Sequence, residues 1–239
     1  MICRLVISVA ATLFGATASS FAADALTSNI PPFSIEQGGR VGFVWEIVSE
    51  IAKRSGTEIN VIYGSNWPQS QEEAKSRPDT LVFPLARTAA RESQYQWVQK
   101  ILDMDVAFAT APGRPKVETD AAARPLKASA YATAHPWSRT SRTAATPTSS
   151  SSSRRPRTRA LHDGTIDAWY APVPEVAFNW VELKLAAAPA FGLKLNSTTP
   201  LFIAASKNTP GIDLEKLRAA YASMERDGML ARILGTYGL

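Results

Sequence analysis

The sequence predicts an α/β fold, because strand-like and helix-like segments alternate along the chain. Short runs with alternating or fully apolar patterns indicate strands, and longer runs with apolar residues at helical spacing indicate helices. The 239 residues are enough for one large domain or for two lobes of ordinary size. The alternation is interrupted at residues 128–160, whose composition differs from that of the flanking chain.

The N-terminus has the pattern of a cleavable signal peptide. An apolar run, Leu5–Gly15, is followed by small residues, so we expect cleavage after Ala22, with Ala23 as the alternative. The apolar run is about half as long as the ~20 residues that a membrane span requires. Cys3 is the chain's single cysteine, so removal of residues 1–22 leaves no disulfide and no thiol chemistry.

The individual elements follow from local patterns. Apolar residues from Phe43 to Ile51 recur on one helical face, and Gly56 is expected to end that helix. Upstream, Asn29–Ile35 is expected to form a short strand that ends in a proline-stiffened loop. The segments expected next are a strand at Glu58–Tyr63, a helix at Gln69–Lys75, a strand at Thr80–Leu85, a polar loop at Thr88–Glu92, and the apolar segments Tyr95–Ile101 and Val106–Ala109. After the interruption we expect a helix ending at Ala160–Gly164, a strand at Ile166–Tyr170, a helix at Glu175–Leu185, a strand at Leu201–Ala205, and helices at Leu214–Met224 and Met229–Leu234.

The net charge of +5 comes from the interrupted region. The whole chain has 26 Lys and Arg residues against 21 Asp and Glu residues. Residues 128–160 hold six of the arginines and no acid, so the rest of the chain has 20 basic and 21 acidic residues. Nucleic-acid surfaces interleave cations with aromatic or hydrogen-bonding groups, whereas Tyr131 and Trp137 both precede these arginines. No nucleic-acid partner is therefore expected.

Four segments in a fixed order carry a resemblance to a known family. They are Pro31–Ser34 with Gly42 and Phe43, Thr88–Glu92 with Tyr95–Trp97, Asp163–Ala168, and Met224–Gly228 with the short helix that closes the chain near Tyr237. In this order, and together with the signal peptide, they resemble the family 3 extracellular solute-binding proteins. Those proteins are receptors of the polar-amino-acid type that serve ABC transporters.

The resemblance implies a type II periplasmic-binding-protein-like fold of two α/β lobes, joined by two crossover strands, that close around a ligand cleft. Lobe 1 would comprise residues 23–109 and 196–239, and lobe 2 residues 110–195. The implied partners are a small-molecule solute and the membrane component of an ABC transporter. The protein is expected to be a periplasmic monomer without cofactor or metal.

The resemblance also assigns candidate anion-binding residues. The family's arginine in the Thr-x-x-Arg-Glu segment clamps a ligand carboxylate, and here that residue is Arg91. The planar guanidinium suits this task because it donates two parallel hydrogen bonds. Arg87 is a second candidate anion contact. The alternative for Arg91 is a surface arginine paired with Glu92 or with solvent.

Aromatic residues are candidates for the cleft walls. Phe33 and Trp67 would serve on lobe 1, with Trp169 and Tyr170 opposite them on lobe 2; the alternative for each is ordinary core packing. Relatives that bind α-amino acids usually present a carboxylate five residues after the aspartate that corresponds to Asp167. That position is Pro172 here, so a small carboxylate or another organic anion is expected rather than a standard amino acid.

Residues 128–160 lack the strand, the ligand loop and the helix that the resemblance requires in lobe 2. A shifted reading frame would explain this, because five serine codons of the TCN type, Ser149–Ser153, would then encode five apolar residues. The same shift permits a Gly-Thr loop from Thr133 onward. We expect a compensated pair of frameshifts here, with partial disorder of lobe 2 and poor affinity in the chain as written. The alternative is a flexible linker rich in serine and arginine.

Two other function classes are weighed against a receptor. An enzyme on the same scaffold, of the cyclohexadienyl dehydratase type, needs a positioned acid or base. The two histidines are His135, inside the interrupted stretch, and His162, beside a turn, and no hydrolase or phosphate-loop motif is present. A ligand-sensing domain would continue into a transmembrane helix, and the sequence ends at Leu239 without one. A receptor without enzymatic activity is therefore expected.

Overall fold

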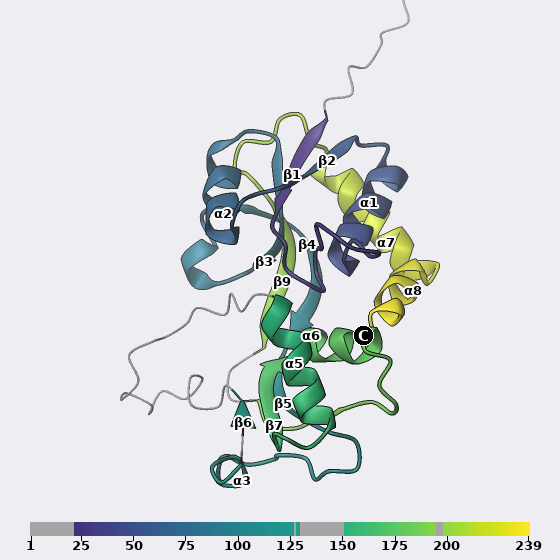
Figure 1. Ribbon diagram of the computed structural model, residues 1–239. Coiled ribbons are helices and arrows are strands. Elements are labelled where there is room, and N and C mark those ends of the chain that lie inside the picture. The colour runs from purple at the N-terminus through teal and green to yellow at the C-terminus, as the bar shows by residue number, and fades with distance from the viewer. Residues whose placement is uncertain (1–21, 127, 130–150, 195–197) are drawn as a thin grey trace, which may run out of the picture.

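The computed structural model describes residues 22–126, 128–129, 151–194 and 198–239. Their strands form two separate sheets, one of five strands and one of four. Figure 1 shows helices α1, α2, α7 and α8 around the five-stranded sheet, and α5 and α6 beside the four-stranded sheet. This two-sheet α/β architecture agrees with the predicted fold class.

The first sheet has the strand order β2-β1-β3-β9-β4. Strand β1 runs parallel to both β2 and β3, whereas β9 runs antiparallel to both β3 and β4. We call this sheet and its helices lobe 1. Its elements are β1 (Ala23–Thr27), α1 (Phe43–Ser55), β2 (Ile59–Tyr63), α2 (Trp67–Ser76), β3 (Thr80–Ala86), the 3-10 helix η1 (Ala89–Arg91), β4 (Gln96–Met104), β9 (Thr199–Ala205), α7 (Leu214–Arg226) and α8 (Met229–Thr236).

The second sheet has the strand order β6-β7-β5-β8 and forms lobe 2 with its helices. Strand β7 pairs in parallel with β6 and antiparallel with β5. The elements of lobe 2 are β5 (Val106–Thr110), α3 (Asp120–Ala123), β6 (Ala128–Ser129), α5 (Ser151–His162), β7 (Ala168–Pro172), α6 (Val173–Glu182) and β8 (Ala190–Phe191).

Between the described elements, the chain passes from one sheet to the other twice. The first crossing is at Asp105, which separates β4 from β5. The sequence had placed this lobe boundary later, between residues 109 and 110. The return crossing lies between β8 and β9, and the predicted boundary at 195–196 is outside the described residues.

Helix α1 shows how a local pattern produces a packed element. Its predicted apolar face is buried, with Phe43 and Ile47 both at 0% exposure. Each such side chain contributes about 1.5–3 kcal/mol by leaving water. Gly56 follows the helix with φ 67°, a left-handed conformation that glycine adopts without steric cost, so the predicted helix end is confirmed.

The expected strand at Asn29–Ile35 is wrong. The strand lies earlier, at β1, and the later segment is a turn closed by a bridge between Ile30 and Ser34. Consecutive prolines remove two backbone donors, so this segment cannot form a sheet ladder. The displacement matters because the turn follows the carboxyl end of β1.

Two sequence-based predictions concern residues outside the described set. Residues 1–21 belong to the predicted signal peptide, and residues 130–150 belong to the interrupted stretch. The two ends of residues 128–160 are described as β6 and as part of α5, so the expectation that this stretch contains neither strand nor helix is wrong at its ends. In the described part of the chain, no helix is long and apolar enough to cross a membrane.

Candidate functional site

The carboxyl ends of the parallel strands β1, β2 and β3 lie at one edge of the first sheet. Strand β4 ends at the same edge, because β3 and β4 are both antiparallel to β9. The chain passes from the end of β4 through Asp105 into lobe 2, so this edge faces lobe 2. Ligands of open α/β sheets bind outside the carboxyl ends of strands. The candidate site, which we call the strand-end edge, comprises residues 28–42, 64–67 and 87–91.

Four buried hydroxyl groups hold the segment after β1 in place. The Oγ1 of Thr27 lies 2.8 Å from the Oγ of Ser34, which donates to the carbonyl oxygen of Ser28 at 2.6 Å. Ser70 of α2 donates to the carbonyl oxygen of Thr27 at 3.0 Å, and its Oγ lies 3.1 Å from the Oγ of Ser28. This hydroxyl cluster joins the end of β1 to α2. It therefore fixes the relative position of two segments of the strand-end edge.

The guanidinium of Arg87 is occupied by partners within lobe 1. It donates two hydrogen bonds to the carboxylate of Glu92, at 2.9 Å and 2.5 Å. It also lies over the rings of Trp97 and Phe202, at 5.3 Å and 5.2 Å from their centroids. The hydrogen bonds from Arg87 lower the pKa of Glu92. Both hydrogen bonds and both ring contacts are internal, so the geometry describes a structural role for Arg87.

Arg91 differs from Arg87 in its partners. It is half-buried at the end of η1, and its Nη1 donates to the carbonyl oxygen of Ala86 at 3.2 Å. Among the described residues, no carboxylate lies within ion-pair distance of Arg91. A guanidinium has five N–H donors, so this one retains donors for an anion. A carboxylate at the strand-end edge can accept two of them in parallel.

The two lobe 1 aromatic candidates lie on different parts of this edge. Phe33 is buried, at 6% exposure, and its ring lies 5.2 Å from the ring of Phe43. Trp67 is half-buried and opens α2, directly after Asn66. The side chain of Asn66 accepts a hydrogen bond from the backbone of Gln69 at 2.9 Å and so fixes the start of the helix. The structure therefore brings Phe33, Trp67 and both arginines to the strand-end edge.

The two lobe 2 candidates lie on opposite faces of the second sheet, because consecutive strand residues alternate. Trp169 is 2% exposed and packs with Leu161 and Trp180. Tyr170 is 5% exposed, and its ring lies 4.9 Å from that of Phe108. The structure thus places both in the core of lobe 2 and does not bring them together with Arg91. Their part in binding stays a prediction.

Asp105 joins the two crossings between the lobes. Its carboxylate accepts hydrogen bonds from Lys194 at 2.5 Å and from Thr198 at 2.6 Å, and its backbone carbonyl accepts one from Val173 at 2.9 Å. The bonds from Lys194 and Thr198 lower the pKa of Asp105. These contacts hold the two connections between the lobes together. No local sequence pattern indicated a role for Asp105.

An aromatic row that sequence reasoning missed crosses from lobe 1 to lobe 2. The ring of Phe43 lies 5.8 Å from that of Tyr237, and Tyr237 stacks on Phe178 of α6 at 5.7 Å. Phe33 extends the row on the lobe 1 side. The available signal was the short closing helix before Tyr237, which marked the segment without indicating its partner.

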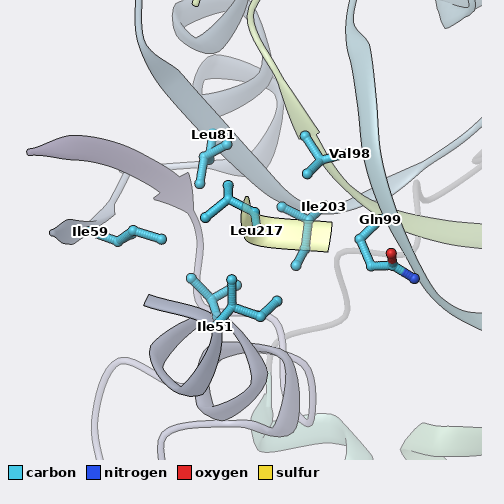
Figure 2. A pocket seen from close by; sticks show the side chains of 8 residues that line it. Ile51, Ile59, Leu81, Val98, Gln99, Ile203 and Leu217 are labelled. Carbon is cyan, nitrogen blue, oxygen red and sulfur yellow. The ribbon is translucent and has the colours of Figure 1, made fainter. Parts of the chain in front are cut away.

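Figure 2 shows a small apolar cavity in lobe 1. Its lining comes from α1, α7 and the first sheet, and it consists of Val48, Ile51, Ile59, Leu81, Val98, Gln99, Ile203 and Leu217. No charged side chain lines it, and none of its lining residues belongs to the strand-end edge. We therefore assign it to imperfect packing between helices and sheet, and not to solute binding.

Comparisons with known proteins agree with this architecture. The sequence model of the bacterial extracellular solute-binding proteins, family 3, matches residues 25–239. A search of curated protein sequences finds no match.

Solved structures with the same fold cover nearly the whole chain. An ancestral cationic amino acid solute-binding protein has a TM-score of 0.66 at 13% identity, over 91% of this chain and 96% of that one. Substrate-binding domain 2 of GlnP from Lactococcus lactis, in an open conformation, has a TM-score of 0.61 at 15% identity, over 90% and 94%. An arginine 3rd transport system periplasmic binding protein from Legionella pneumophila has a TM-score of 0.57 at 16% identity, over 91% of this chain and 100% of that one. At these identities the likeness establishes the fold.

Proposed function

Because the chain belongs to the bacterial extracellular solute-binding proteins of family 3, we propose that it captures a small carboxylate-bearing solute between its two lobes and delivers it to an ABC transporter. The proposed location is the periplasm, reached by cleavage of residues 1–22. N-terminal sequencing of the exported protein tests this part, with Ala23 expected as the first residue. A protein that keeps its N-terminus would contradict the export step.

The observation that carries the proposal is the contrast between two arginines at the strand-end edge. Arg87 is engaged by Glu92 and by two aromatic rings. The guanidinium of Arg91 has one backbone carbonyl as its hydrogen-bond acceptor and no acid partner in the described chain. A half-buried guanidinium without a carboxylate favours binding of an anion, because its desolvation is then compensated.

The end of β7 bears on the class of solute. Pro172 is the last residue of β7 and precedes α6, at the position where relatives that bind amino acids place a carboxylate. Proline has no charge to offer an ammonium group. We therefore propose a small organic acid over a standard α-amino acid, although similar structures carry names that refer to cationic amino acids and arginine. If an amino acid binds, Glu175 in the first turn of α6 is the acid expected to meet its ammonium group.

A thermal-shift screen followed by calorimetry tests the proposal. The purified chain, and a version with the reading frame of 128–160 restored, are screened against mono- and dicarboxylic acids and the standard amino acids. Arg91→Gln should weaken binding of the selected solute by about 10- to 100-fold, because a hydrogen bond to a charged group contributes about 1.5–3 kcal/mol. Arg226→Gln, an exposed arginine on α7, is the matched control and should bind normally.

The outcomes separate the parts of the proposal. Equal affinity in wild type and Arg91→Gln would reject Arg91 as the anion site. Tight binding of an ordinary amino acid that is lost in Glu175→Gln would reject the organic-acid class while keeping the receptor function.

We also propose that the protein binds its solute without chemical turnover. His162 lies at the exposed end of α5, where its Nδ1 is 2.8 Å from Asp163 Oδ1. Its ring lies 5.7 Å from that of Trp180, within lobe 2 and away from the strand-end edge. The described histidine is therefore not placed as an acid or base for a solute near Arg91. Release of product from cyclohexadienyl acids in a turnover assay would contradict this part.

A further inference from the structure

The last residues of lobe 1, Tyr237 and Gly238, pack against helix α6 of lobe 2. Tyr237 is completely buried, and its ring stacks on Phe178 of α6 with an interplanar angle of 27°. Gly238 has φ 79°, and a Cβ added there would lie 3.0 Å from Val181 and 3.4 Å from the carbonyl oxygen of Ala177. Figure 1 shows the C-terminus beside α6. The close approach and the positive φ both require glycine at this position.

Tyr237 is anchored on its other side by lobe 1. Its hydroxyl donates to Glu46 Oε1 at 2.6 Å and accepts from the backbone N–H of Gly42 at 3.1 Å. Gly42 is itself held closely, because a Cβ there would lie 2.6 Å from the carbonyl oxygen of Phe33. The ring of Tyr237 therefore has a fixed position in lobe 1 and presents one face to lobe 2.

Arg40 connects the same three segments electrostatically. Its Nη1 donates to the carbonyl oxygen of Thr236 at 2.6 Å, and its guanidinium lies 5.1 Å from the centroid of the Tyr237 ring. Its Nε lies 3.1 Å from Oε1 of Glu182, in the last turn of α6. One side chain from the loop before α1 thus contacts both the C-terminal segment and lobe 2.

We propose that these contacts form an interlobe latch, consisting of Arg40, Tyr237 and Gly238 on lobe 1 and Phe178 and Glu182 on lobe 2. The latch holds α6 against lobe 1 and favours the described arrangement of the lobes over a more open one before any solute binds. Its function rests on the proposed solute capture, in which the two lobes open and close around a solute. The ion pair makes closure dependent on salt, because half-exposed charges are screened.

Distance measurements between spin labels on the two lobes test the latch in the absence of solute. Cys3→Ser removes the chain's single cysteine, and labels are then attached at Lys53→Cys on α1 and Glu118→Cys in lobe 2, both exposed positions. Pulsed electron–electron double resonance measures the distribution of distances between the two labels. Arg40→Gln should raise the open fraction about two- to fivefold, the range expected for a partly exposed ion pair.

Further variants separate the latch from general destabilisation. Phe178→Leu keeps apolar volume but removes ring stacking, and should raise the open fraction about two- to tenfold. The charge exchange Arg40→Glu with Glu182→Arg restores the ion pair but not the contacts of Arg40 with Thr236 and Tyr237, so it should return the open fraction part of the way toward that of wild type. Lys100→Gln breaks an ion pair within β4, between Lys100 and Asp103, and should change nothing.

Unchanged distributions in both Arg40→Gln and Phe178→Leu would overturn the latch. If Phe178→Leu fails to fold, Arg40→Gln and the charge exchange still decide the question. Because these measurements use no solute, a latch effect together with a failed solute screen would reject the proposed function and keep the latch. A successful solute screen together with unchanged distance distributions would reject the latch and keep the proposed function.

Discussion

Lobes 1 and 2 hold their candidate binding residues in different ways. In lobe 1, Trp67 and Arg91 follow the ends of β2 and β3, in segments that lie beyond the sheet. In lobe 2, Trp169 and Tyr170 lie within β7 and pack on its two faces. A side chain inside a central strand belongs to the core, whereas one after a strand end faces the space in which ligands bind. Position relative to the strand end is thus more informative than residue type.

The largest effect is expected from restoring the reading frame of residues 128–160, which would give lobe 2 strand-end segments comparable to those of lobe 1. We propose that nucleotide sequencing will find an apolar run encoded in the shifted frame at Ser149–Ser153. The restored chain should bind its solute at least tenfold more tightly in calorimetry, because both sides of the cleft then contact it. A shifted frame that encodes no apolar run would reject this prediction.

A core substitution in lobe 2 should affect stability more than any change at the lobe 1 edge. Trp169→Ala removes a ring that is 2% exposed, so the free energy of unfolding should fall by about 3–5 kcal/mol. Urea denaturation followed by circular dichroism measures it. Trp67→Ala, at a half-buried helix start, serves as the comparison and should cost less. If Trp169→Ala instead weakens solute binding at unchanged stability, Trp169 lines the cleft.

The hydroxyl cluster should have an intermediate effect on lobe 1. Ser70→Ala leaves the carbonyl oxygen of Thr27 and the hydroxyl of Ser28 without this partner, which should cost about 1–3 kcal/mol in unfolding free energy. Ser76→Ala, on the same helix but exposed, is the matched control. Equal stability of the two variants in urea denaturation would mean that the cluster does not hold α2 to β1.

The smallest effect concerns pH and the pair of Arg87 and Glu92. The hydrogen bonds from Arg87 depress the folded-state pKa of Glu92 below its unfolded value. The pair therefore adds stability above the unfolded pKa of about 4.5, and this is lost as the pH falls through the folded pKa. The Tm of wild type should decrease more steeply below about pH 4.5 than that of Glu92→Gln. If differential scanning calorimetry gives parallel plots of Tm against pH for wild type and Glu92→Gln, the pair does not add stability above about pH 4.5.

Elements with strong local patterns could be predicted from the sequence, and weakly patterned ones could not. Helix α1 was predicted because its buried residues repeat every three to four positions and Gly56 ends it. Strand β1 was missed because Ala23–Thr27 mixes small residues with one acid and one leucine. Its stability comes from pairing with β2 and β3 on both sides, which no local pattern records.

The sequence by itself determined the α/β class, the family resemblance and the segment that carries Arg91, because these depend on residues close together in the chain. Only the tertiary structure decided that Glu92 pairs with Arg87 and that Arg91 has no acid partner among the described residues. It alone placed Tyr237 against Phe178. Such contacts depend on how the lobes and the strand ends are arranged in space. Periodicity along the chain indicates which face of its own helix or strand a residue lies on, and not which distant residue it contacts.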